Sequence, residues 1–316
     1  FVAQARRTRD LWAGSWLLSY LTESALVAAE EAGGHSVIPF RSDAHRRRIT
    51  AKDSPVGGMP NRFEITFEGD NAKADAIAAA KLSKAAFDEA WQNVAETVFE
   101  KFIQPIIDAG TAPHTKEIWD RQIKNFWETS WVVAAPASTS DTIGALAAAR
   151  KQFRNVAVSS ESGVKCSLMP TLQELSGFKS NTDQQKGFWN AIRRQINTHD
   201  LDDTERLCAI ALIKRLFPHM IEEATGARFS DEQRFWPSTA FLAAVPWLKQ
   251  VDQNSEWKNK AQIHLQQALQ CGYSESERHA ASAVAIPWAT ADGPIWFSSA
   301  IRRDEPGGTG TNKERK

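Results

Sequence analysis

The sequence has little cysteine, no excess of charge of either sign and no long apolar run. Its 316 residues include three cysteines, too few for a disulfide scaffold, which fits a reducing cytoplasm. Lys+Arg and Asp+Glu each number 38, so the net charge is zero and a mainly basic nucleic-acid binder is disfavoured. The longest apolar run, from Phe241 to Leu248, has about eight residues, against the ~20 that span a membrane. These absences predict a cytoplasmic protein without a membrane partner.

The motifs of common enzyme classes are also absent. No Walker loop, dinucleotide fingerprint, His-Glu-x-x-His or Gly-x-Ser-x-Gly element occurs. No Asp pair sits in a Gly-bounded hairpin, as a two-metal polymerase or cyclase requires, since Asp202-Asp203 precede a predicted helix. The chain begins at Phe1, inside a predicted element, and has a Gly-rich charged tail, so both ends are interpreted as cut.

The first part of the sequence alternates between helical and strand periodicity. Apolar spacing predicts elements in the order helix, strand, strand, helix, helix and strand, over 1–32, 36–40, 63–67, 71–108 (ended or kinked by Pro105), 116–125 and 126–135. With one strand added before Phe1, and the short helix set aside, this order becomes βαββαβ, the ferredoxin-like arrangement. We therefore predict an α+β chain in which a ferredoxin-like domain lacks its first strand.

The second part of the sequence is mainly helical. Helices are expected over 142–154, 188–197, 203–217, 231–248 and 256–271, the third of them capped by Asp202 or Asp203. The predicted domains are the ferredoxin-like domain over 1–140, a helical domain over 141–290, and a linker with a polar tail over 291–316.

Two motifs suggest metal chemistry but have simpler interpretations. His199-Asp200 could belong to a metal phosphohydrolase, yet it lies in a polar turn before a helix, which favours a capping turn. Cys166 could begin a zinc ribbon, but Met169 stands where a second cysteine is needed. Buried or unremarkable thiols are therefore expected at Cys166, Cys208 and Cys271.

Three arginine clusters could bind phosphate. They are Arg6-Arg7-Arg9, Arg46-Arg47-Arg48 and Arg302-Arg303. A charge cluster is more often a solvated face. The first cluster is the better candidate because it sits on the rigid helix predicted over 1–32, near its N-terminal end, where backbone amides also attract anions.

The opening segment, Phe1-Val2-Ala3-Gln4-Ala5-Arg6-Arg7-Thr8-Arg9-Asp10-Leu11-Trp12 and onward to Leu21, resembles a known family. It is similar to the first palm domain of the large, polymerase/cyclase-like subunit of type III-B CRISPR effector complexes, the Cmr branch of the Cas ten family. Further similar segments follow in the family's order, at 59–63 (MPNRF), 126–131 (FWETSW), 205–209 with 214–217 (ERLCA and KRLF), 237–240 (PSTA) and 245–247 (VPW).

The resemblance implies a ferredoxin-like palm, a helical domain and then a second palm with a Gly-Gly-Asp-Asp turn. Family members bind ATP between the palms and make cyclic oligoadenylates when target RNA is bound. Some also carry an N-terminal nuclease domain, which is missing before Phe1. In this chain the Cys-x-x-Cys zinc element, near 163–177, is reduced to Cys166 with Met169, which counts against zinc. The second palm, with the Asp pair that would hold Mg or Mn, is also absent.

The resemblance leads to one main interpretation. The chain is expected to be an inactive first palm plus a helical domain of an antiviral effector, not catalytic by itself, with other Cmr subunits, guide RNA and target RNA as partners. It would supply one wall of an ATP pocket, with Asn61 and Arg62 as candidates for that wall and Arg6 and Arg7 as weaker candidates for phosphate contact. A turn with a surface arginine is the simpler interpretation of Asn61-Arg62.

Two alternatives stay open. The chain could be half of a split cyclic oligoadenylate synthase whose catalytic palm is a separate polypeptide. It could also be a structural module that positions RNA without a nucleotide site. Some of the twelve tryptophans could stack on bases, although tryptophans on amphipathic helices are more often core and interface anchors.

Overall fold

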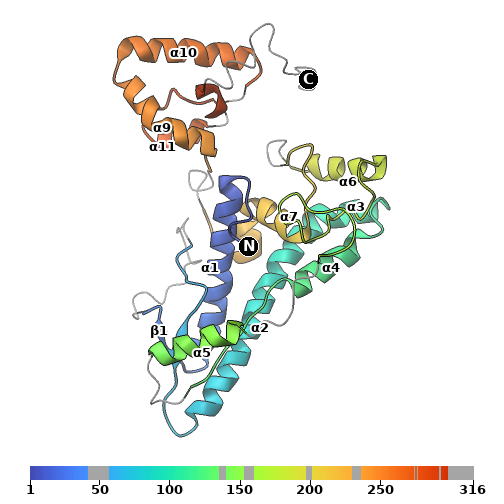
Figure 1. The fold of residues 1–316 in the computed structure, drawn as a ribbon, viewed down its shortest axis with the longest axis vertical. Coiled ribbons are helices and arrows are strands. Elements are labelled where there is room, and N and C mark those ends of the chain that lie inside the picture. The colour runs from blue at the N-terminus through green and yellow to red at the C-terminus, as the bar shows by residue number, and fades with distance from the viewer. Residues whose placement is uncertain are drawn as a thin grey trace. The chain divides into compact units, whose positions relative to one another are not determined.

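The chain is mixed but mainly helical. A computed structural model describes residues 1–41, 57–134, 140–152, 160–196, 201–229, 236–273, 275, 277–291 and 293–297 (Figure 1). The chain folds into two compact units. The first consists of Phe1–Arg6 and Asp10–Phe229, and the second consists of Arg7–Arg9 and Ser230–Lys316. The domain boundaries expected from the sequence stay a prediction.

The first unit contains two long helices, a small sheet and several shorter helices. In chain order its elements are α1 (Thr8–Glu31), β1 (His35–Ile38), β2 (Glu64–Thr66), α2 (Ala72–Val98), the π-helix η2 (Phe99–Ile103), α3 (Gln104–Asp108), α4 (Thr115–Asn125), α5 (Ser140–Gln152), α6 (Asp183–Arg193), α7 (Ala209–Leu216), the 3-10 turn η3 (Phe217–His219) and α8 (Ile221–Thr225). In the described part of the chain, no helix is both long and apolar enough to cross a membrane.

Helix α1 confirms the amphipathic pattern of the opening segment. It buries Trp16, Leu17 and Leu21 on one face, as the helical spacing predicts. The helix ends where the Gly33-Gly34 pair predicts an end. Gly33 adopts a φ of +94°, and the Gly34 amide donates to the carbonyl of Ala29, which satisfies one of the last helical carbonyls.

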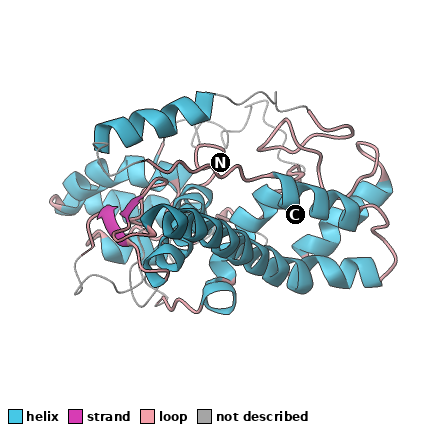
Figure 2. Cartoon of the chain, turned by 90° about the horizontal axis from the view of Figure 1, so that it is seen from below, coloured by secondary structure: helices cyan, strands magenta, loops and turns pink. Residues whose placement is uncertain are grey.

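The sheet consists of β1 and β2, the two strands found among the described residues (magenta in Figure 2). They pair antiparallel, with His35 opposite Thr66 and an irregularity between Ser36 and Ile38. Gly34 permits the close approach of the second strand, because a Cβ there would lie 2.4 Å from the side chain of Ile65. The order of α1, β1, β2 and α2 agrees with the prediction.

The helical pattern over 71–108 is formed by three successive elements. α2 continues directly into η2 and then into α3. Pro105 lies in the first turn of α3, where a missing amide hydrogen costs little, so the chain passes through one turn of π-helix before it. The predicted break at Pro105 is therefore found a few residues earlier, at the end of α2.

The prediction of a strand over 126–135 is wrong for residues 126–134, which have no strand pairing in the structure. The reason is visible in the aromatic packing. The rings of Phe126 and Trp127 both contact the ring of Phe1, at centroid distances of 5.6 and 4.9 Å, and both contact Trp91. Adjacent side chains of a strand point to opposite faces, so two neighbours packed into one cluster are incompatible with a strand.

The helix predicted over 203–217 begins later than expected. α7 starts at Ala209, so Asp202 and Asp203 do not cap it. The preceding residues instead bond to the loop around residues 165–175. The Ser167 amide donates to the Arg206 carbonyl at 2.7 Å, and the Leu175 amide donates to the Leu207 carbonyl at 3.0 Å. These tertiary bonds outweigh the helical preference of the local sequence.

Helix α7 lies in the middle of the first core. All eight of its residues are buried, and the helix contacts α2, α4 and η3. Trp16 of α1 and Phe217, which follows α7, are in ring contact with centroids 5.5 Å apart. A central, fully buried helix explains why a charged pair such as Lys214-Arg215 within it must find partners inside the protein.

The second unit is a small helical group. Its elements are α9 (Thr239–Asp252), α10 (Ser255–Gln270), α11 (Arg278–Ala283) and the 3-10 turn η4 (Gly293–Trp296). Ser238 caps α9 by accepting a bond from the Phe241 amide, and Pro246 is accommodated inside that helix. Phe241 and Leu248 of α9 form its core together with Ala281 and Ile286.

Candidate functional site

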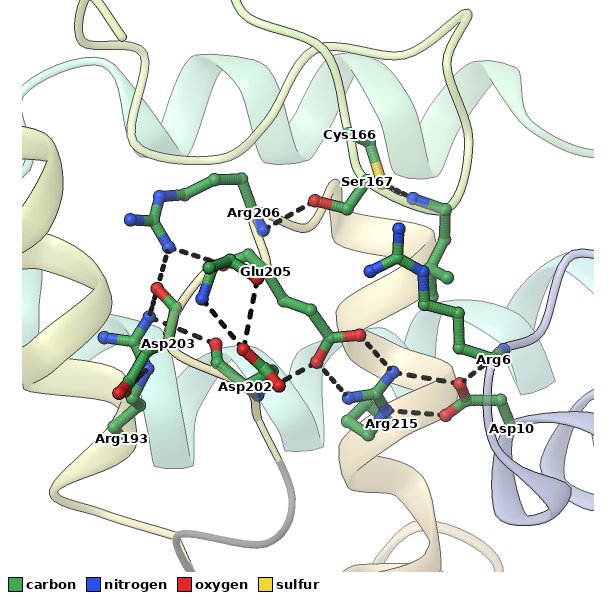
Figure 3. Close-up of polar contacts among 12 residues, drawn as sticks. Arg6, Asp10, Cys166, Ser167, Arg193, Asp202, Asp203, Glu205, Arg206 and Arg215 are labelled. Atoms are coloured by element: carbon green, nitrogen blue, oxygen red, sulfur yellow. Dashed lines mark hydrogen bonds and ion pairs between the residues drawn. The ribbon is translucent and has the colours of Figure 1, made fainter. Parts of the chain in front are cut away.

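An ion triad of Asp10, Glu205 and Arg215 joins three segments of the first unit. Asp10 lies in the first turn of α1, Arg215 in the last turn of α7, and Glu205 in the segment that precedes α7. The Arg215 guanidinium donates to both carboxylates, in each case to both oxygens (Figure 3). The distances are 2.6 and 2.9 Å to Asp10 and 2.7 and 3.0 Å to Glu205.

The triad is removed from solvent. The side chains of Arg215 and Asp10 are 0% exposed and that of Glu205 is 2% exposed. Burial alone would lower the pKa of Arg215, but the hydrogen bonds to Glu205 and Asp10 outweigh it and raise that pKa above its usual value. Because the three charged groups bond to one another, the arrangement can hold α1 to α7 but does not present a reactive group to a substrate.

Lys214, next to this triad in sequence, is also buried. Its Nζ donates to the carbonyls of Phe1 and Gln4, each at 2.8 Å, and lies 4.9 Å from the centre of the Phe1 ring. Burial lowers the pKa of Lys214 to about 8. The segment before α1 is thus fixed by a lysine of α7, and the beginning of α1 by the neighbouring arginine.

A second polar cluster surrounds Gln122 of α4. Its Oε1 accepts a 2.8 Å bond from the Ala209 amide, so a side chain from α4 caps α7. Its Nε2 donates to the Glu161 carboxylate at 2.7 Å and to the Gln173 carbonyl at 2.8 Å. Arg121 donates to Glu161 at 2.9 Å. The cluster fixes the loop of residues 160–176 against α4 and α7.

The stability that Glu161 contributes should depend on pH. Burial would raise its pKa, but bonds from Arg121, the Gln173 amide and Gln122 together lower it below about 4.5, its usual value. The unfolded chain then binds the proton first, so this stability is present above about pH 4.5 and is lost as the pH falls through the folded pKa. Glu161→Gln should lower the free energy of unfolding by about 1.5–3 kcal/mol near neutral pH.

Urea unfolding of wild type and variant at about pH 7 and about pH 3 measures this dependence. The difference between them should shrink at the lower pH. Glu117→Gln is the matched control, because Glu117 is exposed and 3.8 Å from the same arginine, and it should change stability by less than about 0.5 kcal/mol. A Glu161→Gln effect that stays constant with pH contradicts the assignment.

Three sulfur atoms meet beside the start of α7. The Cys208 thiol lies 3.7 Å from the Met169 thioether, and Cys166, like Cys208, is a free and buried cysteine. Interaction with the Cys208 thiol lowers the pKa of Cys166 to about 7, whereas burial raises the pKa of Cys208 above its usual value. A structural zinc ion takes four nitrogen, oxygen or thiolate ligands. In the described part of the chain no group of three His, Cys, Asp or Glu could hold a metal, so these residues do not fit zinc.

The structure places the residues predicted for the ATP wall in different parts of the fold. Asn61 and Arg62 are exposed just before β2, and the Arg62 guanidinium lies against Gly144 of α5. Arg6 is exposed, and its amide donates to Asp10 of the ion triad at 3.2 Å. Arg7 belongs to the second compact unit.

The segment before Asn61 contacts the middle of α1, through a 3.4 Å bond from Ser19 to the Met59 carbonyl. That contact is about three helical turns from the start of α1. The structure therefore does not bring Arg6 and Asn61 into one site. The remaining arginine candidates, at 46–48 and 302–303, and the His199-Asp200 pair lie outside the described residues.

The second unit contains a cavity of about 430 Å³ between α10 and the segments around Glu275 and Trp288. Its polar lining is made of Gln262, Gln266, Glu275 and Thr290, together with the edge of Trp288. The described residues that line it include no lysine or arginine. Glu275 is already paired with Arg278, and a carboxylate in a lining without a lysine or arginine disfavours a triphosphate. This cavity therefore does not match the nucleotide pocket expected from the sequence.

Sequence reasoning missed the residues that carry the buried charge network. Asp10, Glu205 and Gln122 were not singled out, because a single acidic or amide side chain on a helix is ordinarily solvated. One signal was available. The run from Ala209 to Leu216 is apolar except for Lys214 and Arg215, and charges in such a run require buried partners.

The fold and its clusters define a mixed, mainly helical protein whose buried charges connect distant segments. Residues 1–96 match the family model described as CRISPR-associated protein Cmr2, N-terminal. The match covers α1, β1, β2 and most of α2 within a chain of 316 residues. It supports a Cmr2-like subunit of a type III CRISPR effector over that segment. No curated protein matches the sequence.

Proposed function

We propose that the chain is part of the large subunit of a type III-B CRISPR effector complex, where it acts as a scaffold for other Cmr subunits and for guide and target RNA. The match of residues 1–96 to the Cmr2 N-terminal family is the observation that carries this proposal. A scaffold role is supported by the ion triad and the Gln122 cluster, which connect segments far apart in sequence.

We further propose that α1, β1, β2 and α2 belong to a ferredoxin-like palm. Their order and the antiparallel pairing of β1 with β2 are those of the middle of a βαββαβ unit. A sheet of two short strands is marginal by itself, so a further strand paired beside it would complete the palm. In this proposal that strand comes from outside the described residues.

Asn61 and Arg62 are proposed as this chain's contribution to an ATP pocket shared with a second palm. Both are exposed at the entry to β2, where an amide and a guanidinium can reach a bound nucleotide. Guanidinium groups bind phosphate through paired N–H donors. Mg or Mn would be held by the second palm. Phosphate contact by Arg6 and Arg7 is a separate proposal, because the structure does not bring Arg6 together with Asn61. ATP bound in the shared pocket would supply the adenylyl group for oligoadenylate synthesis.

Arg62→Ala tests the pocket in a reconstituted effector complex that contains this chain, a Gly-Gly-Asp-Asp palm, the other Cmr subunits, guide RNA and target RNA. Removing one charge-assisted contact should weaken ATP binding by about tenfold or more, measured by isothermal titration. Cyclic oligoadenylate synthesis at limiting ATP should fall similarly. Arg194→Ala, at the exposed arginine that follows α6, is the matched control and should leave both unchanged.

Assembly is measured separately by size-exclusion chromatography, so the scaffold and the pocket can fail independently. Failure of the chain to enter a complex with Cmr subunits contradicts the scaffold. Normal assembly with unchanged ATP affinity of Arg62→Ala contradicts the pocket and favours the RNA-positioning alternative. Synthesis that appears only after a separate Gly-Gly-Asp-Asp chain is added identifies a split synthase.

A further inference from the structure

The three sulfur atoms of Cys166, Cys208 and Met169, here called the sulfur cluster, come from two segments that are brought together by the fold. Cys166 and Met169 lie three residues apart in the loop that packs against α7, and Cys208 immediately precedes α7. Their exposed fractions are 3%, 0% and 1% for Cys166, Cys208 and Met169. The cluster is thus enclosed by protein.

The backbone around Cys166 is arranged to stabilise a thiolate. The amides of Leu168 and Met169 both donate to the Cys166 sulfur, each at 3.4 Å. Two amide donors on one sulfur compensate a negative charge that would otherwise be costly inside the protein. The same turn directs the Met169 thioether toward the cysteine of the second segment.

Positive potential also reaches Cys208. It occupies the N-cap position of α7, a helix of eight residues whose first amides attract negative charge. Lys214, one and a half turns further along that helix, interacts electrostatically with Cys208. Two thiolates and one monovalent cation carry a net charge of −1, which this helix end and lysine offset in part.

We propose that the sulfur cluster is a binding site for a soft monovalent metal ion, Cu(I) or Ag(I). Thiolate and thioether sulfurs select such ions, whereas zinc requires a fourth ligand that the cluster lacks. With metal–sulfur bonds of about 2.3 Å, neighbouring sulfurs of a three-coordinate ion lie about 4 Å apart. The 3.7 Å separation of Cys208 and Met169 is close to that value. Binding replaces the two thiol protons, which are released to solvent.

This inference is independent of the proposed CRISPR function and concerns the full chain alone. The reduced protein is titrated anaerobically with Cu(I) against a coloured Cu(I) chelator, and with Zn(II) against a zinc chelator. The proposal expects that each chain binds one Cu(I) ion and that the protein does not take Zn(II) from the zinc chelator. Ag(I) should raise the thermal midpoint of unfolding, because it binds the folded state.

Substitutions assign the ligands. Cys166→Ser or Cys208→Ser should weaken Cu(I) binding by more than the ~10–100-fold that loss of a supporting hydrogen bond costs. Met169→Leu keeps the size of the side chain and should weaken binding less. Cys271→Ser, at the exposed third cysteine, is the matched control and should bind like wild type. Circular dichroism verifies that each variant is folded.

Four outcomes overturn the proposal. One is a wild-type protein that cannot compete with the Cu(I) chelator. Another is Cu(I) binding that is unchanged in folded Cys166→Ser and Cys208→Ser proteins. The third is zinc binding that survives competition. Formation of a Cys166–Cys208 disulfide in place of metal binding, detected by mass spectrometry in the reduced buffer, also contradicts it.

Discussion

Replacing Arg215 with methionine is expected to lower the free energy of unfolding by about 3–5 kcal/mol. The substitution removes the single cation of the ion triad and leaves the carboxylates of Asp10 and Glu205 facing each other without solvent. The two buried carboxylates then repel each other, and the remaining amide bonds from Arg6 and Asp202 do not replace the lost guanidinium. Urea unfolding followed by circular dichroism measures the loss.

Two further variants separate the charge effect from the loss of packing. In Asp10→Leu/Glu205→Met/Arg215→Met all three charges are gone, and replacing a whole buried ion network with apolar residues often costs little. This triple variant should therefore be more stable than Arg215→Met alone. Arg194→Met, at the exposed arginine that follows α6, should change stability by less than about 0.5 kcal/mol. A triple variant that is no more stable than Arg215→Met contradicts this account of the triad.

Gly293→Ala is expected to destabilise the second unit by about 3 kcal/mol. A Cβ at Gly293 would lie 2.1 Å from the amide nitrogen of Phe241 and 2.7 Å from the carbonyl carbon of Ala240. Both atoms are backbone of α9, so the clash cannot be relieved by a change of side-chain rotamer. The turn η4 must then move away from α9, where Phe241 is fully buried.

Gly187→Ala supplies the matched control for this prediction. Gly187 lies within α6, and nothing lies within 4 Å of a Cβ placed there. Alanine should stabilise that helix by about 0.5–1 kcal/mol, because glycine loses more backbone freedom on folding. Limited proteolysis and thermal unfolding of the two variants give the measurement. Equal behaviour of Gly293→Ala and wild type would show that η4 does not pack on α9 in this way.

The elements that sequence reasoning predicted well are those whose preference is local. The amphipathic spacing of Trp16, Leu17 and Leu21 defines α1, and Gly33-Gly34 supplies its end. The alternation of Phe63, Ile65 and Phe67 indicates β2, although the strand itself covers only Glu64–Thr66. In α1 the short-range periodicity and the observed burial agree. In β2 the position of the strand agrees but the burial does not, because Glu64 is buried and Ile65 is only half-buried.

The errors arise where distant residues decide the conformation. Phe126 and Trp127 are as aromatic as strand residues usually are, but both pack into one cluster with Phe1 and Trp91. The residues before Ala209 have helical spacing, but they bond to the loop that contains Ser167. Neither partner can be identified from local sequence, because the contacts join positions many tens of residues apart.

The candidate sites also depend on contacts between residues that are far apart in the sequence. The spacing of Cys166 and Met169 was visible in the sequence, whereas the approach of Cys208 to them required the fold. Likewise, an arginine inside an apolar helix requires a buried partner, but the sequence could not identify Asp10, which lies 205 positions from Arg215. Asn61 and Arg62 were predicted from a family resemblance, and their exposed position before β2 leaves their role as a proposal.

The cap that Gln122 provides for α7 has a consequence for the order in which the chain folds. Cys208 makes no side-chain cap of its own, so the first amide of the helix depends on a residue 87 positions earlier in the chain. A helix of eight residues is too short to be stable before it docks. Its formation is therefore coupled to the arrival of α4, a contact that closes a long loop and slows folding. The central helix of the core is therefore expected to form late in folding, after α4 has docked against it.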